Sequence, residues 1–170
     1  MEQADQARLT RQVGRALLTV GPAGWTRIRA EYRSAGRHIE VDVFVTGPDG
    51  TAHPMRPPAE VIDGLGRLRQ GMYRPGRGTW LSAVLTIEPP SSYSGDFEPD
   101  LEPRWRRLPP PIGFQDELRF FPRTDEHIPD WLRTRAGLPA VTPARGEPAQ
   151  PGPARPGTGG GSPSGSPPPR

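Results

Sequence analysis

The chain of 170 residues has no cysteine, which excludes a disulfide framework and thiolate chemistry. Its net charge is +3, and all 22 basic residues are arginine. Up to residue 136 there are 19 arginines and 18 acidic residues, scattered rather than striped, so we expect no nucleic-acid partner. No apolar run approaches the roughly 20 residues that cross a bilayer. The start "MEQADQARLT" is not a signal peptide, so we expect a cytoplasmic protein without a membrane segment.

Helical and strand periodicities alternate along the first half of the chain. Leu9, Val13 and Leu17 have the spacing of one helix face, which predicts a helix over 4–19 that ends at "GPAG". Alternating apolar residues then predict a hairpin of strands 25–32 and 37–46, joined by "SAG". In the second strand, Ile39, Val41, Val43 and Val45 are expected on one face, and Glu40, Asp42 and Phe44 on the other.

A second helix, two further strands and a short third helix complete the predicted body. Their expected ranges are 57–73 for the helix, 79–87 and 93–98 for the strands, and 114–121 for the last helix. The order α-β-β-α-β-β-α predicts an α+β sandwich, in which helices pack on an antiparallel sheet. We expect residues 1–136 to form one domain of this kind.

The two C-terminal segments differ in composition. The stretch 119–135, "RFFPRTDEHIPDWLRTR", is rich in functional groups, but its pattern favours a structural clasp: Pro122 ends a helix, and Trp131 and Leu132 return the chain to the body. Residues 137–170 hold ten prolines, eight glycines and no aromatic residue, which predicts a disordered tail or linker. The alternative is a proline-rich ligand, ending in "PPPR", for an SH3-like partner.

Residues with catalytic chemistry are few. Glu40 and Asp42 share one strand face; they suit a metal or acid–base pair, but the pattern favours a solvated face paired with Arg27 or Arg29. His38, His53 and His127 lack metal-site spacing, and no nucleophile elbow or Walker loop is present. We therefore expect no metal, no cofactor and no catalytic residue. A hydrolase built on Glu40, Asp42 and His127 would require all three in one pocket.

An acidic block lies before the clasp. Residues 88–102 contain five carboxylates and no basic residue, with Tyr93 and Phe97 interleaved. Two interpretations stay open: a surface that binds a basic protein partner, or a charged sheet edge that blocks aggregation. The candidate partner-binding residues are Tyr93, Asp96, Phe97, Glu98, Asp100 and Glu102, with Glu40 and Asp42 as a secondary surface. The following "RWRR" (104–107) suits stacking on single-stranded bases, but Trp105 is better interpreted as a packing residue.

Three stretches of the chain have a recognisable pattern: "GTWLSAVLTIEPPSSYSGDFEPDLEPRW" (78–105), "DELRFFPRTDEHIPDWL" (116–132) and the hairpin with its "TGPDG" turn. With these stretches the chain, most strongly in its second half, resembles the YezG-like antitoxins, small immunity proteins of bacterial polymorphic-toxin systems. Pro99 and Pro103 depart from the pattern after the fourth strand. The resemblance implies a single α+β domain without catalytic residues that sequesters a cognate toxin in the cytoplasm. Similar domains also occur beside toxins of the NAD-glycohydrolase type, where the tail would serve as a linker.

The leading hypothesis is therefore an immunity protein that binds and neutralises a protein toxin. The alternative is a regulatory or scaffold domain associated with such a toxin, with the tail as linker or ligand.

Overall fold

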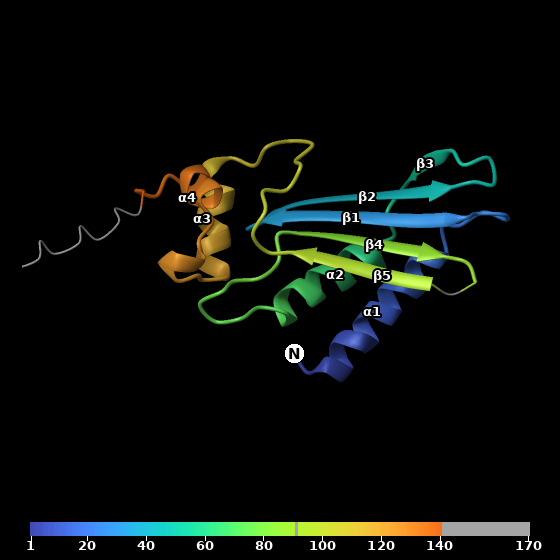
Figure 1. Cartoon of the computed structure of the whole chain (residues 1–170), viewed down its shortest axis with the longest axis horizontal. Helices are drawn as coiled ribbons and strands as arrows, with labels where there is room; N and C mark the ends of the chain where they lie inside the picture. The colour runs from blue at the N-terminus through green and yellow to red at the C-terminus, as the bar shows by residue number, and fades with distance from the viewer. Residues whose placement is uncertain (91, 141–170) are drawn as a thin grey trace, which may run out of the picture.

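The computed structural model describes residues 1–90 and 92–140. Within these residues, helices and a five-stranded antiparallel sheet form an α+β fold, as the periodicities predict (Figure 1). The elements in chain order are α1 (Gln3–Leu18), β1 (Arg27–Ala35), β2 (His38–Thr46), β3 (Ala52–Met55), α2 (Ala59–Gly71), β4 (Ser82–Glu88), β5 (Ser92–Glu98), α3 (Pro111–Phe120), the 3-10 helix η1 (Asp125–His127) and α4 (Asp130–Ala136). The predicted tail, 137–170, lies outside the described residues from residue 141 onward.

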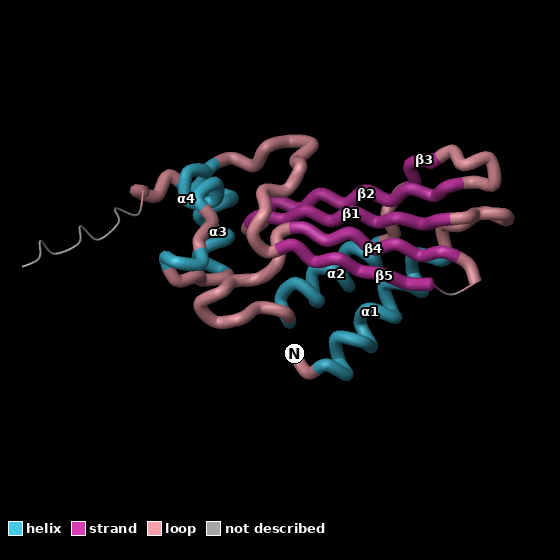
Figure 2. The backbone as a smooth tube through the Cα atoms, in the orientation of Figure 1, coloured by secondary structure: helices cyan, strands magenta, loops and turns pink. Residues whose placement is uncertain are grey.

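The sheet has the order β3-β2-β1-β4-β5, so β1 is central and β3 and β5 are its edges (Figure 2). The β1–β2 hairpin closes between Ala35 and His38, where Gly36 adopts φ 60°. A Cβ at Gly36 would lie 2.5 Å from the backbone oxygen of Gly113, at the start of α3. Glycine therefore serves both the turn and the close approach of α3 to the end of the sheet.

The main core lies between one face of the sheet and the pair α1 and α2. The predicted stripe of α1 is buried there, with Leu9, Val13 and Leu17 between 0 and 5% exposed. The two helices pack closely, since a Cβ on Gly64 of α2 would lie 2.5 Å from the side chain of Val13. Both helices thus cover the same face of the sheet (Figure 1).

A second, smaller core closes one end of the sheet. Phe114 of α3 and Leu132 of α4 are buried there with Leu81, and Trp105 and Trp131 pack around them. The predicted clasp is confirmed in outline, because α3 ends at Phe120 just before Pro122, and Leu132 is fully buried. Phe120, the last residue of α3, is not buried in this core, because its side chain is 41% exposed.

The sequence patterns missed three elements. The strand β3 is only four residues long, contains Pro54 and pairs with β2, so no alternation marked it. The 3-10 helix η1 covers three residues, and the helix α4 covers seven and ends at Ala136, where Gly137 caps it in the left-handed conformation. All three elements are too short for periodicity to detect.

A buried ion pair joins the two cores. Glu117 of α3 is 0% exposed, and one of its oxygens lies 2.5 Å from an Nη atom of Arg69 on α2. Its other oxygen accepts the Gly36 N–H at 2.8 Å. Arg69 also donates from Nε to the Trp80 carbonyl at 2.9 Å and stacks over the ring of Phe121. One pair of side chains therefore connects α2, α3, the β1–β2 turn and the segment before β4.

Removal of one partner of this pair should be strongly destabilising. Glu117→Leu leaves the Arg69 charge buried without a counter-ion and the Gly36 N–H without an acceptor, so we expect a loss of about 3–5 kcal/mol in the free energy of unfolding. Adding Arg69→Met should restore part of that loss, because no buried charge then remains. Urea denaturation of the two single variants and the double variant measures both effects.

The exposed pair of Arg135 with Glu102 provides the control for that series. Glu102→Gln should cost less than about 1 kcal/mol, because solvent already screens this pair. Strictly additive losses in the Arg69 and Glu117 variants would show that the two side chains do not act as a pair.

Candidate functional site

The sheet face opposite α1 and α2 carries mostly polar and charged side chains. The strand registers place its residues in rows across β2, β1, β4 and β5. We call this surface the open face; its residues are Glu40, Asp42 and Phe44 on β2, Arg29, Glu31 and Arg33 on β1, Ser82, Val84 and Thr86 on β4, and Ser94, Asp96 and Glu98 on β5. The side chains of the intervening residues point to the helices, because strand residues alternate between faces.

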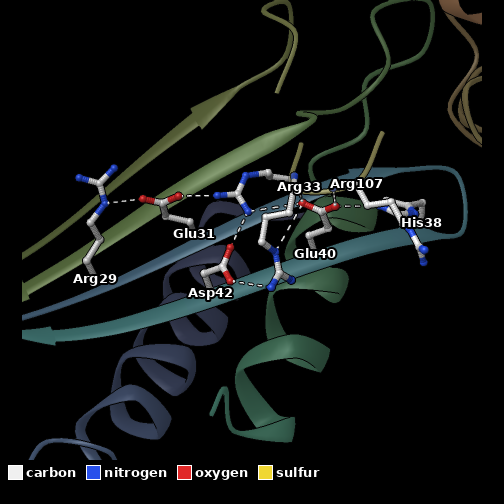
Figure 3. Close-up of polar contacts among 8 residues, drawn as sticks. Arg29, Glu31, Arg33, His38, Glu40, Asp42 and Arg107 are labelled. Atoms are coloured by element: carbon white, nitrogen blue, oxygen red, sulfur yellow. Dashed lines mark hydrogen bonds and ion pairs between the residues drawn. The ribbon is translucent and has the colours of Figure 1, made fainter. Parts of the chain in front are cut away.

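Charged residues of the open face form a continuous chain of ion pairs (Figure 3). Glu31 lies between Arg29, at 2.9 Å, and Arg33, at 2.5 Å. Arg33 also reaches Asp42 at 2.7 Å, and Arg106 binds the other oxygen of Asp42 at 3.2 Å. Each arginine is held by a carboxylate, so the charge pattern of this face is fixed by its own contacts.

Glu40 anchors the loop that follows β5. Its oxygens accept the backbone N–H groups of Arg106 and Arg107, both at 2.9 Å, and the His38 ring lies 3.2 Å away. Burial alone would raise the pKa of Glu40, but the two backbone hydrogen bonds and the contact with His38 outweigh it and hold the pKa below its ordinary value of 4.5. Glu40 is thus a structural carboxylate that ties this loop to β2.

The expectation of a solvated face at Glu40 is wrong. The side chain is only 5% exposed, whereas Ile39, expected in the core, is 49% exposed. The cross-strand partner also differs, because the register sets Arg33 opposite Glu40, and Arg27 pairs instead with Glu88. The loop that contains Arg106 and Arg107 contacts Glu40 near the start of β2 and accounts for its burial, which alternation alone does not predict.

The structure places the four predicted partner-binding residues of β5 on two different faces of the sheet. Asp96 and Glu98 lie on the open face, in the rows of Val84 and Ser82. Tyr93 and Phe97 point the other way: Tyr93 packs beside Gly14 of α1, and Phe97 lies 5.3 Å from Trp80, ring centre to ring centre. Burial raises the pKa of Tyr93 to about 12. The expectation that aromatic and acidic residues form one surface is therefore wrong.

Three of the four predicted acids have structural contacts. Glu98 accepts the backbone N–H groups of Asp100 and Leu101, at 2.8 and 3.1 Å, and so shapes the turn after β5. Asp100 pairs with Arg123 at 3.2 Å. Glu102 pairs with Arg135 of α4 at 2.9 Å, as described above. Among the described residues, Asp96 alone of these acids is exposed and outside every ion pair.

Residues of the hydrolase alternative do not meet. His127 lies on η1, where its ring contacts the Thr124 hydroxyl at 2.8 Å and Glu126 at 3.5 Å. Glu40 and Asp42 are engaged with Arg33 and Arg106 on the open face. In the described ranges, no group of three or more His, Asp or Glu side chains is arranged to hold a metal ion. The condition set for that hypothesis, one shared pocket, is not met.

Sequence reasoning missed Arg33 and Arg106 as members of the open-face network. Arg33 was assigned to no strand, because the first strand was expected to end at Tyr32. The position of the hairpin turn could have indicated Arg33, because a hairpin that turns at Gly36 and Arg37 sets Arg33 opposite Glu40. Arg106 comes from an irregular loop, for which local sequence gives no such signal.

Comparison of the chain with protein-family models gives no match, and a search of curated proteins finds none either. The resemblance to the YezG-like antitoxins therefore stays a prediction. Of the helices in the described part of the chain, none has the length and apolar character of a membrane span.

Glu40→Gln tests the anchoring role. We expect a loss of about 1–3 kcal/mol in the free energy of unfolding near neutral pH, because a neutral amide is a weaker acceptor for the loop. A carboxyl whose pKa is lowered by folding stabilises the protein above its unfolded pKa, and that contribution disappears as the pH falls through the folded pKa. The difference between wild type and variant should therefore shrink at about pH 3, measured by urea denaturation at both pH values.

Glu88→Gln removes an exposed carboxylate from its pair with Arg27 and serves as the control. It should change the stability by less than about 1 kcal/mol at either pH. An equal loss for Glu40→Gln at both pH values would contradict a role for the ionised carboxylate.

Proposed function

We propose that the chain is a non-catalytic protein-binding module, an immunity protein that binds and neutralises a cognate toxin in the cytoplasm of the producing cell. The observation that carries this proposal is the arrangement of the sheet. Its helices cover one face, while the other presents charged side chains that are already fixed by ion pairs. A rigid charged surface of this kind suits recognition of a protein, because little side-chain ordering remains to be completed on binding.

Charge distribution indicates which partner surface fits. On the β5 side of the open face, Asp96 is exposed and the neighbouring Ser94 is neutral. The arginines of this face are each held by a carboxylate, so the unneutralised charge at this margin is negative. A basic surface on the toxin, such as one that binds an anionic substrate, would be attracted to it and would associate faster at low salt.

Asp96→Arg is the variant that tests this surface. It reverses the one exposed, unpaired acid of the predicted set without removing a hydrogen bond of the fold. We expect it to weaken binding of the toxin by about 10–100-fold and to reduce neutralisation, because a like charge then faces the basic partner surface. Co-purification with the product of the adjacent gene, followed by calorimetric titration, measures the effect.

Asp63→Arg on α2 is the matched control, because it makes the same change at an exposed position on the helical layer. It should leave the affinity within about twofold of wild type. If Asp96→Arg and Asp63→Arg bind the toxin equally well, the open face is not the binding surface.

A further inference from the structure

The edge strand β5 has features of a site for an added strand. Within the described residues it pairs only with β4, and it is the last strand on that side of the sheet. The opposite edge, β3, is four residues long and contains Pro54, two features that discourage pairing with another chain. The strand β5 is seven residues long and contains no proline. One edge of this sheet is therefore protected and the other is not.

The backbone groups of β5 that point outward follow from two hydrogen bonds. The Glu98 carbonyl accepts the Leu81 N–H at 2.8 Å, so the backbone groups of Glu98 point toward β4. The Ser34 N–H of β1 donates to the Leu81 carbonyl at 2.9 Å, so this carbonyl points toward β1. The N–H of the next residue, Ser82, therefore points the opposite way, toward β5. Since backbone direction alternates along a strand, Tyr93, Gly95 and Phe97 direct their N–H and C=O groups away from the sheet.

The helix α1 runs beneath this edge, and the surface between them is hollowed at both ends. A hollow of ≈ 320 Å³ lies where Tyr93 and Ile87 meet Gly14, Leu18 and Trp25. A second hollow, of ≈ 450 Å³, lies where Phe97 and Trp80 meet Gln6, Met72 and Tyr73. Tyr93 and Phe97 are on the same face of β5, and four residues of strand separate the hollows by about 13 Å.

Arginines without a carboxylate partner rim both hollows. Arg11 and Arg15 of α1 line the first, and Arg74 and Arg77 line the second. In residues 1–90 and 92–140, none of the four lies within ion-pair distance of an acid. On the opposite side of β5, the open face presents the negative charge of Asp96. Asp100, whose ion-pair partner is Arg123, also lines the second hollow, so the side of the edge toward α1 is apolar with an excess of positive charge, and the side toward the open face is anionic.

We propose that β5 binds an extended segment of the protein partner, which adds a sixth strand to the sheet. Its backbone would bond Tyr93, Gly95 and Phe97, and two apolar side chains at i and i+4 would enter the two hollows. Acidic residues two positions outside that pair would meet the arginines, and a basic residue between them would face Asp96. The identity of the natural partner rests on the proposed function. The evidence for the site itself is the unpaired strand edge, the two hollows and the charges around them.

A synthetic peptide with this pattern, DTLRVKLTD with blocked ends, is the test ligand. Its two leucines have the i, i+4 spacing, its aspartates share their face, and its basic residues lie on the other face. Amide hydrogen exchange is measured by NMR on the full chain, with and without peptide. At a peptide concentration about ten times its dissociation constant, exchange at Tyr93, Gly95 and Phe97 should slow about tenfold.

The amides of Ser94 and Asp96 are the internal control. They point toward β4, so they should exchange slowly in the free chain and change little on binding. Binding of the peptide without protection of the three outward amides would overturn the proposal, as would the absence of binding at millimolar peptide. Protection of the same amides in the free chain that rises with protein concentration would show that a second copy, and not a partner segment, occupies the edge.

Single-residue variants distinguish binding of the peptide at this site from unspecific binding elsewhere on the chain. Arg11→Glu should weaken the peptide about threefold or more, because it places a negative charge beside the peptide aspartate. Arg67→Glu on α2, an exposed arginine that lines neither hollow, should leave the affinity unchanged. Equal affinity for Arg11→Glu and Arg67→Glu would contradict the assigned charge match. If the peptide protects the three amides but the chain fails to neutralise the toxin, the strand site is supported and the proposed function is rejected.

Discussion

The fold depends on one buried ion pair, Arg69 with Glu117. Each member uses its remaining polar atoms on backbone groups, since Glu117 accepts the Gly36 N–H and Arg69 donates to the Trp80 carbonyl. A buried pair is stabilising only when such additional hydrogen bonds compensate the desolvation of both charges. Because these backbone groups belong to the β1–β2 turn and the start of β4, the pair fixes the small core of α3 and α4 against the end of the sheet.

Ion pairs between arginines and carboxylates also lie along the open face, where most of the side chains are more exposed. Arg33 is buried and lies within ion-pair distance of three carboxylates there, those of Glu31, Glu40 and Asp42, while Arg29 and Arg106 extend the array to more exposed positions. The exposed members add little to stability, because solvent screens them. What they provide is a fixed pattern of charge on a rigid sheet, next to an edge strand that the fold leaves unpaired. The open face and the β5 edge therefore adjoin one another and can contact a single partner.

Local patterns in the sequence predicted the elements but not the contacts between them. The helices α1, α2 and α3 and the strands β1, β2, β4 and β5 were predicted, because each carries apolar residues at helical or strand spacing. The pair Arg69–Glu117 joins residues 48 positions apart, and no local pattern indicates it. The burial of Glu40 was missed for the same reason, because the loop that covers it begins more than 60 residues later. For the candidate site, alternation already implied that Tyr93 and Phe97 face away from Asp96 and Glu98, so that error was avoidable.

Four of the arginines are part of the structure itself. Arg33, Arg69, Arg123 and Arg133 are all buried, and Arg123 alone donates to the carbonyls of Thr79, Pro99 and His127. A lysine cannot replace such a residue, because its single ammonium group does not reach several carbonyls in a planar fork. These four cations are neutralised or bound within the fold, and those of the open face are held by carboxylates. Arg11, Arg15, Arg74 and Arg77, which rim the β5 edge, pair with no acid of residues 1–90 and 92–140, and they flank apolar hollows and unpaired backbone. The proposed strand site at this edge fits an extended protein segment with carboxylates on its side toward α1 and a basic residue on its side toward Asp96.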